Sequence, residues 1–137
     1  MAEGGTGYDH MVTMARAKSI WGPYEEDPGN PVLTSDMENP DALQRCGHAD
    51  IVCTQKGEWY MVHLCGRPPK GSGQCVLGRE TAIQKMVWNE EGWLRMACGG
   101  NFGQWETEEP EGLVECLFPE EAGKDYGRDD FNIEILA

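Results

Sequence analysis

Four short stretches of the sequence place a polar or charged side chain beside glycine or at the end of an apolar run. They are AEGGT at residues 2–6, GHAD at 47–50, HLCGRP at 63–68 and LGRET at 77–81. Glycine next to a functional side chain lets a ligand or another backbone come close. The candidate groups are the carboxylate of Glu3, the imidazole of His48 and the guanidinium of Arg79.

Each candidate also has a purely structural interpretation. Glu3 lies near the chain end and is compatible with a solvated carboxylate, and His48 is compatible with a histidine packed in a strand. Arg79 and Glu80 are compatible with a surface ion pair, which stabilises a fold little. Single motifs of this kind therefore leave both interpretations open.

The remaining histidines and the longest glycine-rich loop predict no further site. We expect His10 and His63 to be structural. The loop GGNFG at residues 99–103 lacks the Lys and Ser/Thr of a phosphate-binding loop. Nucleotide binding is therefore not supported.

The charge balance excludes two classes of partner. The 137 residues carry 11 Lys+Arg and 24 Asp+Glu, a net charge of −13, and the acid is concentrated in residues 101–137, with 11 Asp+Glu against 2 Lys+Arg. A nucleic-acid binder needs a basic face, and so does a protein that binds an anionic membrane. We expect neither kind of partner.

Nothing in the sequence predicts export or membrane insertion. No apolar run approaches the roughly 20 residues that a membrane helix needs. The N-terminal MAEGGTGYDH has neither a basic region nor an apolar one of the signal-peptide kind. We expect a cytoplasmic location.

The six cysteines are expected to be reduced structural thiols. They show no CxxC spacing and no dense framework, and most lie in or beside an apolar run. The alternative is a zinc site that uses Cys46, His48 and a later cysteine. Structural zinc sites usually bring paired ligands at closer spacing.

These candidate residues lie on or between short strands. Apolar and aromatic runs predict strands at residues 49–53, 58–64, 81–88 and 93–96, with turns at 55–57 and 89–92. A short strand at 11–17 and a breaker-rich loop at 25–31 precede them. Four successive antiparallel strands are typical of one propeller blade, although a β-sandwich would have the same short strands.

Taken together and in this order, six blocks of the sequence resemble glycoside hydrolase family 43, in particular its β-xylosidase and α-L-arabinofuranosidase branch. The blocks are AEGGTGYDH, MARAKSIWGPYE, NPVLT, GHADIV, GEWYMVHLCGRP and LGRETAIQ, followed by Gly92-Trp93. The resemblance runs from Ala2 to about Trp93. KDYGRDDF at residues 124–131 is similar to the family's exit from the catalytic domain toward a C-terminal β-sandwich.

The resemblance implies an all-β fold that is part of a five-bladed β-propeller. Five blades of about 40–45 residues need roughly 200 residues or more, so the chain would hold about two to three blades. We expect residues 1–105 to belong to the glycosidase propeller. Residues 106–137 are expected to form an acidic propeller edge and a linker toward a further domain.

The resemblance also implies roles for the three candidate residues. The histidine of GHAD, here His48, lies on the channel axis, where many members hold a metal ion, often calcium. The arginine of LGRET, here Arg79, contacts the sugar. Glu3 is a possible site-lining, substrate-binding residue. The implied substrates are xylo-oligosaccharides or arabinosides of xylan, cleaved by an inverting pair of carboxylates.

The catalytic carboxylates of that mechanism are not expected in this chain. The family's general acid lies shortly upstream of the AEGGT block, and the base belongs to still earlier blades. Asp9 and Asp50 match no catalytic position. We therefore expect the chain to be part of a glycosidase and inactive by itself; the alternative is a non-catalytic carbohydrate-binding or interaction module.

Overall fold

The computed structural model describes residues 2–3 and 7–113, and these residues form strands, turns and loops without a helix. The strands are β1 (Ala2–Glu3), β2 (Met11–Val12), β3 (Ala15–Arg16), β4 (Glu25–Glu26), β5 (Gln44–Cys53), β6 (Trp59–Gly66), β7 (Arg79–Trp88) and β8 (Leu94–Met96). All strand pairs are antiparallel. The all-β expectation is confirmed. The described residues contain no helix that could span a membrane.

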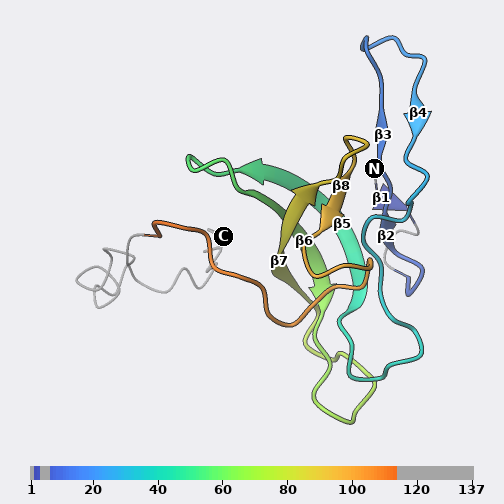
Figure 1. Cartoon of the computed structure of the whole chain (residues 1–137). Helices are drawn as coiled ribbons and strands as arrows, with labels where there is room; N and C mark the ends of the chain where they lie inside the picture. The colour runs from blue at the N-terminus through green and yellow to red at the C-terminus, as the bar shows by residue number, and fades with distance from the viewer. Residues whose placement is uncertain (1, 4–6, 114–137) are drawn as a thin grey trace, which may run out of the picture.

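Strands β5 to β8 form one four-stranded sheet in the order β5-β6-β7-β8 (Figure 1). This is the predicted meander. The first turn closes because Thr54 N–H donates to the carbonyl of Glu58 (2.8 Å) and Gly57 takes a φ of 81°, which glycine adopts without steric cost. Strands β5 and β7 begin earlier than predicted, at Gln44 and Arg79.

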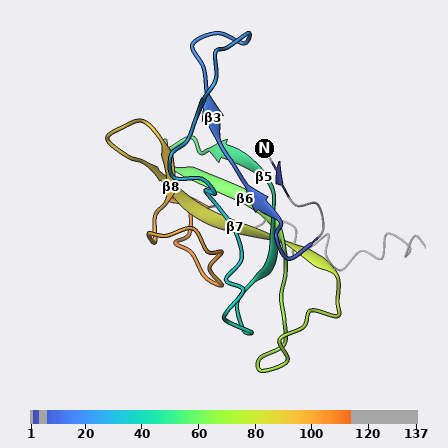
Figure 2. The same cartoon turned by 90° about the vertical axis from the view of Figure 1, so that its right-hand side faces the viewer.

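The N-terminal part forms two small ribbons, β1-β2 and β3-β4. In Figures 1 and 2 the β3-β4 hairpin extends away from the four-stranded sheet. The sequence predicted one strand at 11–17 and a loop from Glu25 onward, and both predictions were wrong in detail. Residues 11–17 divide between β2 and β3, and Glu25 lies in β4 opposite Arg16, with which its carboxylate pairs across the ribbon (3.0 Å).

The core lies between the N-terminal segments and one face of the sheet. Val12 of β2 forms an antiparallel bridge with Leu33, which attaches residues 31–34 to the ribbon. Against them pack Leu43, which precedes β5, and buried residues of the sheet, namely Cys46, Met61, Cys65, Met86, Leu94 and Met96. Packing of this kind, from segments far apart in sequence, fixes the sheet relative to the ribbons.

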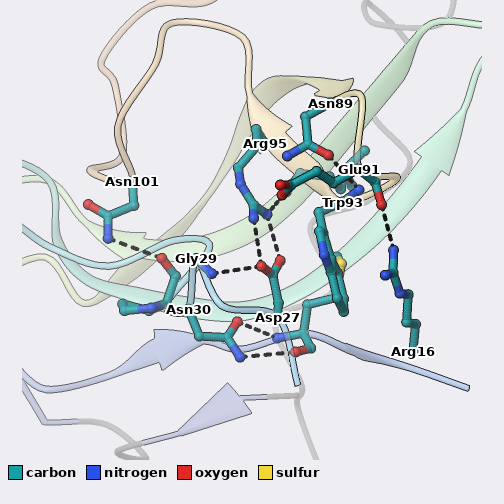
Figure 3. A network of polar contacts seen from close by, with 12 residues as sticks. Arg16, Asp27, Gly29, Asn30, Asn89, Glu91, Trp93, Arg95 and Asn101 are labelled. Carbon is teal, nitrogen blue, oxygen red and sulfur yellow. Dashed lines mark hydrogen bonds and ion pairs between the residues drawn. The ribbon is translucent and has the colours of Figure 1, made fainter. Parts of the chain in front are cut away.

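A buried ion pair joins the hairpin to the outer strand of the sheet (Figure 3). Arg95 of β8 donates two hydrogen bonds to the carboxylate of Asp27, at 2.5 and 2.6 Å, and the Asp27 side chain is fully buried. Gly29 N–H donates to the same carboxylate (2.8 Å). A Cβ at Gly29 would lie 2.6 Å from the Arg95 guanidinium, so glycine makes room for the pair.

Two further contacts reinforce this junction between ribbon and sheet. The Asn30 side chain donates to the carbonyl of Met14 (2.9 Å) and accepts from its N–H (2.8 Å), as a paired strand would. Arg16 stacks on the Trp93 ring, 3.9 Å from its centre, and donates to the carbonyl of Glu91. Figure 3 shows these groups around the Asp27–Arg95 pair.

The segment after β8 returns across the sheet. Thr34 forms a parallel bridge with Phe102, and Lys85 of β7 pairs with Glu108 (2.7 Å). The described part of the acidic stretch therefore contacts the sheet. The domain division at residues 105 and 106 stays a prediction, and residues 114–137, with the KDYGRDDF block, lie outside the described residues.

Candidate functional site

His48 lies in an irregular stretch at the start of β5. The register against β6 shifts twice, between Gln44 and Gly47 and between Gly47 and Asp50. Arg45 and His48 both take positive φ angles, 54° and 53°, in the left-handed region that non-glycine residues seldom occupy. His48 is exposed. The strand is thus bent so that this imidazole is presented to solvent.

His10 supports this bulge from inside. Its ring is 2% exposed, and Nδ1–H donates to the carbonyl of Arg45 (3.1 Å). A Cβ at Gly47 would overlap the His10 ring. Gly47 is therefore glycine because a buried ring occupies the space where its side chain would be. Strained backbone that is held by its surroundings is frequent at functional sites.

Arg79 is the first residue of β7 and is exposed. In the part of the chain that the structure describes, its guanidinium has no hydrogen bond or ion pair. The neighbouring Glu80 pairs with Arg67, through two hydrogen bonds of 2.9 and 2.8 Å, so the ion pair between Arg79 and Glu80 that the sequence left open does not form. The hydrogen bonds from Arg67 lower the pKa of Glu80.

The strand register brings His48 and Arg79 to one end of the sheet. Gln44 pairs with Gly66, and Gly66 pairs with Arg79, so these three form one row across β5, β6 and β7. His48 lies four residues further along β5. Two exposed side chains without partners among the described residues thus lie on alternate strands at the same end.

Glu3, the third candidate, lies in β1, opposite Met11 of β2. Strand β1 lies against β5, the strand that carries His48. This places the backbone of Glu3 near the bulge, and its role as a site-lining residue stays a prediction.

The two histidines that the sequence assigned to the structure are both buried. His63 is 1% exposed; its Nδ1–H donates to the carbonyl of Leu64 (3.2 Å), and its Nε2 accepts from the Gln84 amide (3.3 Å). Burial lowers the pKa of His63. His63 is therefore a neutral side chain of the interior, without access to a ligand.

The five described cysteines are free. Cys46 and Cys65 are buried, and burial raises the pKa of both thiols, that of Cys65 to about 11. Nowhere among the described residues do three His, Cys, Asp or Glu side chains come together to hold a metal ion. The zinc alternative gains no support.

The described residues do not by themselves form a calcium site. Calcium takes six to eight oxygen ligands, whereas His48 offers a ring nitrogen and belongs to no group of three metal-ligating side chains among the described residues. Calcium at His48 stays a prediction.

An all-β meander with an exposed histidine and arginine at one end is consistent with a blade of a β-propeller glycosidase. The model of the family described as "Glycosyl hydrolases family 43" matches residues 1–94. The chain belongs to this family. Solved members are five-bladed β-propellers, so the described residues are part of such a propeller.

Relatives with established names are similar over most of this chain. It is 54% identical over 98 residues to a xylosidase/arabinosidase 43B of Humicola insolens, covering 72% of the chain and 18% of that protein. It is 47% identical over 130 residues to a beta-xylosidase of Bacillus subtilis, covering 87% and 24%. The chain therefore spans less than a quarter of the length of either relative.

A solved structure gives the same result for the fold. The xylan beta-1,4-xylosidase of Bacillus halodurans C-125 matches with a TM-score of 0.74 and 55% identity, over 83% of this chain and 22% of that one. The predicted family and fold class are thus confirmed.

Proposed function

We propose that this chain is part of a glycoside hydrolase that cleaves O-glycosyl bonds in xylo-oligosaccharides or arabinose-substituted xylan. The observation that carries the proposal is the pair of exposed, unpaired side chains, His48 and Arg79, at one end of a family 43 blade. The glycosidase names of the relatives support it.

Arg79 is the proposed sugar contact. A guanidinium presents several N–H donors in one plane and keeps its charge at every physiological pH, so it can donate to sugar hydroxyls or orient a carboxylate. Glu80 is held by Arg67 and does not compete for this guanidinium. His48 is proposed to lie beneath the substrate, where the bulge presents it.

Hydrolysis would follow the inverting scheme in the full-length enzyme. One carboxylic acid protonates the leaving oxygen, and one carboxylate activates water on the opposite face of the sugar. Neither Asp9 nor Asp50 matches these positions of the family. The 137-residue chain would therefore bind and orient sugar without supplying the acid and base.

The isolated chain is expected to release nothing measurable from an aryl β-xyloside or an aryl α-L-arabinofuranoside. General acid and general base each contribute roughly 10²–10⁴-fold, so losing both is severe. Turnover by the purified chain that disappears on Arg79→Ala would overturn this expectation.

Sugar binding tests the role of Arg79 directly. Calorimetry of the chain with xylobiose is expected to give heat that Arg79→Ala removes. Lys56→Ala is a matched control, because Lys56 is an exposed cation in the turn at the opposite end of the sheet. Equal binding by Arg79→Ala and the parent chain would contradict the proposed role.

A non-catalytic carbohydrate-binding module is the second candidate, and the relatives do not favour it, because their names are those of glycosidases. Restoring the missing segments separates the two. A chain extended with the preceding blades that binds xylobiose but hydrolyses no xyloside would favour the module.

A further inference from the structure

One glutamine side chain ties the segment that follows β8 to the sheet. Gln84 of β7 is 1% exposed, and both ends of its amide bind the backbone of Gln104. Its Nε2 donates to the Gln104 carbonyl (2.9 Å), and its Oε1 accepts from the Gln104 N–H (3.3 Å). Strand β8 pairs with residues 86–88 of β7, so this amide takes the place of a strand partner beyond the end of β8.

The same amide nitrogen also binds a histidine, and this fixes the state of the ring. His63 Nδ1 lies 3.2 Å from the Leu64 carbonyl, which can only accept, so Nδ1 carries a proton. In the neutral ring Nε2 is then an acceptor, and it accepts from Gln84 Nε2 (3.3 Å). His63 and Gln104 therefore require the same orientation of the Gln84 amide.

Protonation of His63 makes these two requirements incompatible. An imidazolium donates from both nitrogens, so its Nε2–H would face the amide nitrogen of Gln84. Turning the Gln84 amide over would offer Oε1 to the ring, but it would also place oxygen against the Gln104 carbonyl and nitrogen against the Gln104 N–H. Neither orientation satisfies both a charged His63 and the Gln104 backbone, and buried polar groups without partners are costly.

The groups packed around the His63 ring are neutral. A Cβ at Gly103 would lie 3.0 Å from Cys46 Sγ of β5 and 3.6 Å from the His63 ring. Cys65 lies two residues after His63 and so on the same face of β6. These two thiols are the titratable groups that the described residues place on this side, and burial raises the pKa of both. Strand β7 contributes Gln84, which carries no charge.

The pKa of the His63 ring gives the direction of the effect. Burial lowers this pKa and outweighs the hydrogen bond to the Leu64 carbonyl, which raises it. An open state in which water reaches the ring has the ordinary pKa of 6.5 and binds more protons. Acid therefore favours the open state below pH 6.5, by at most about tenfold per pH unit.

We propose that His63, Gln84 and Gln104 form an acid-sensitive switch, which holds residues 103–107 on the sheet at neutral pH and releases them when His63 takes up a proton. These residues form part of the wall of a cavity of about 680 Å³ beside β6 and β7. Their release would open that cavity and leave the ladders of the four-stranded sheet in place, because Gln104 belongs to none of them.

Hydrogen exchange of the Gln104 amide tests the switch in the chain itself. Its protection factor, which is corrected for the intrinsic pH dependence of exchange, is expected to be constant above pH 6.5. Between pH 6.5 and 5 it should fall by up to about 30-fold. The ring signals of His63 should titrate over the same range, and Gln104 should exchange faster than the amides of β6, because it opens locally.

Three variants separate the switch from a general effect of acid. His63→Gln takes up no proton, so the protection of Gln104 should no longer depend on pH. Gln84→Met removes both hydrogen bonds to Gln104 at similar side-chain length, so Gln104 should exchange rapidly at every pH while β6 stays protected. His48→Gln is the matched control, because His48 is exposed, and it should keep the pH dependence of the parent chain.

The results that would overturn the switch can be stated for the parent chain and for the variants. Gln104 protection that stays constant from pH 7.5 to 5 in the parent chain would overturn it, whether or not the His63 ring titrates. A fall of protection that persists in His63→Gln would overturn it as well, because another group would then be the cause. A fall in the parent chain and in His48→Gln that is absent from His63→Gln would support it.

Discussion

Two bidentate arginine–carboxylate pairs lie in different surroundings. At the junction of hairpin and sheet, Arg95 binds Asp27, whose side chain is fully buried. At the end of the sheet that carries Arg79, Arg67 binds Glu80, and the two side chains are 54% and 38% exposed. The first pair connects parts of the chain 68 residues apart, and the second connects the ends of neighbouring strands.

The difference shows which interactions hold the fold and which only shape the site. Burial by itself raises the pKa of Asp27, but the hydrogen bonds from Arg95 and Gly29 N–H outweigh it and lower that pKa. Removing one partner of such a pair leaves a buried charge uncompensated. Glu80 and Arg67 keep water as an alternative partner, so their pair contributes little to stability.

The largest effect is expected from breaking the buried pair. Asp27→Asn removes the charge at nearly constant volume and leaves Arg95 without a counter-ion. The free energy of unfolding should fall by about 3–5 kcal/mol. Urea unfolding followed by circular dichroism measures it.

The matched control for Asp27→Asn is Glu80→Gln, the same carboxylate-to-amide change in the exposed pair. If Asp27→Asn unfolds at the same urea concentration as the parent chain, the junction does not depend on this charge, and the contrast between the two pairs fails.

The next effect concerns the irregular start of β5, where the buried His10 ring packs against Gly47. Gly47→Ala places a methyl group against the buried His10 ring. Such overpacking should cost about 1–3 kcal/mol. Adding His10→Ala removes the obstacle, so the double variant should lose less stability than the two single changes predict together. Urea unfolding of all three variants gives this coupling, and additive losses would mean that the ring does not support the bulge.

The sequence could predict the regular part of this architecture. The four strands of the sheet follow from alternating apolar and aromatic runs, and the turn at Gly57 from a residue that tolerates a positive φ. His48 and Arg79 were found from short motifs, and their placement at one end follows from the register of a meander once its turns are known.

The bulge and the buried junction could not be predicted in this way. Alternation has a period of two residues, so the two register shifts before Asp50 interrupt the signal, and β5 was predicted to begin at residue 49. The segment with Asp27 contains breakers and acidic residues that indicate a loop. Its partner Arg95 lies 68 residues away in the sequence, and a local sequence pattern does not indicate a contact at that separation.

The pH dependence of the free energy of unfolding also tests the difference between buried and exposed groups. It concerns a third side chain, that of His63. The buried His63 has a lowered pKa, so the folded state binds fewer protons than the unfolded state, where the reference value is 6.5. The contribution of the neutral His63 ring to the free energy of unfolding is complete above pH 6.5. It is lost as the pH falls below 6.5, by at most about 1.4 kcal/mol per pH unit. Urea unfolding between pH 7.5 and 5 measures the slope. His63→Gln should flatten it, and an unchanged slope would show that other groups cause it.

The smallest effect is expected from Glu80→Gln, and its salt dependence sharpens the comparison. The pair that it breaks is solvated on both sides, so the free energy of unfolding should fall by less than about 1 kcal/mol. In 1 M salt, where charges are screened beyond about 3 Å, this small loss should vanish, whereas the loss in Asp27→Asn should persist because water and ions do not reach the fully buried carboxylate. Stability measured at low and high salt for both variants and the parent chain provides the test. If Glu80→Gln costs as much as Asp27→Asn, or if salt removes both losses alike, then exposure does not decide what these two pairs contribute.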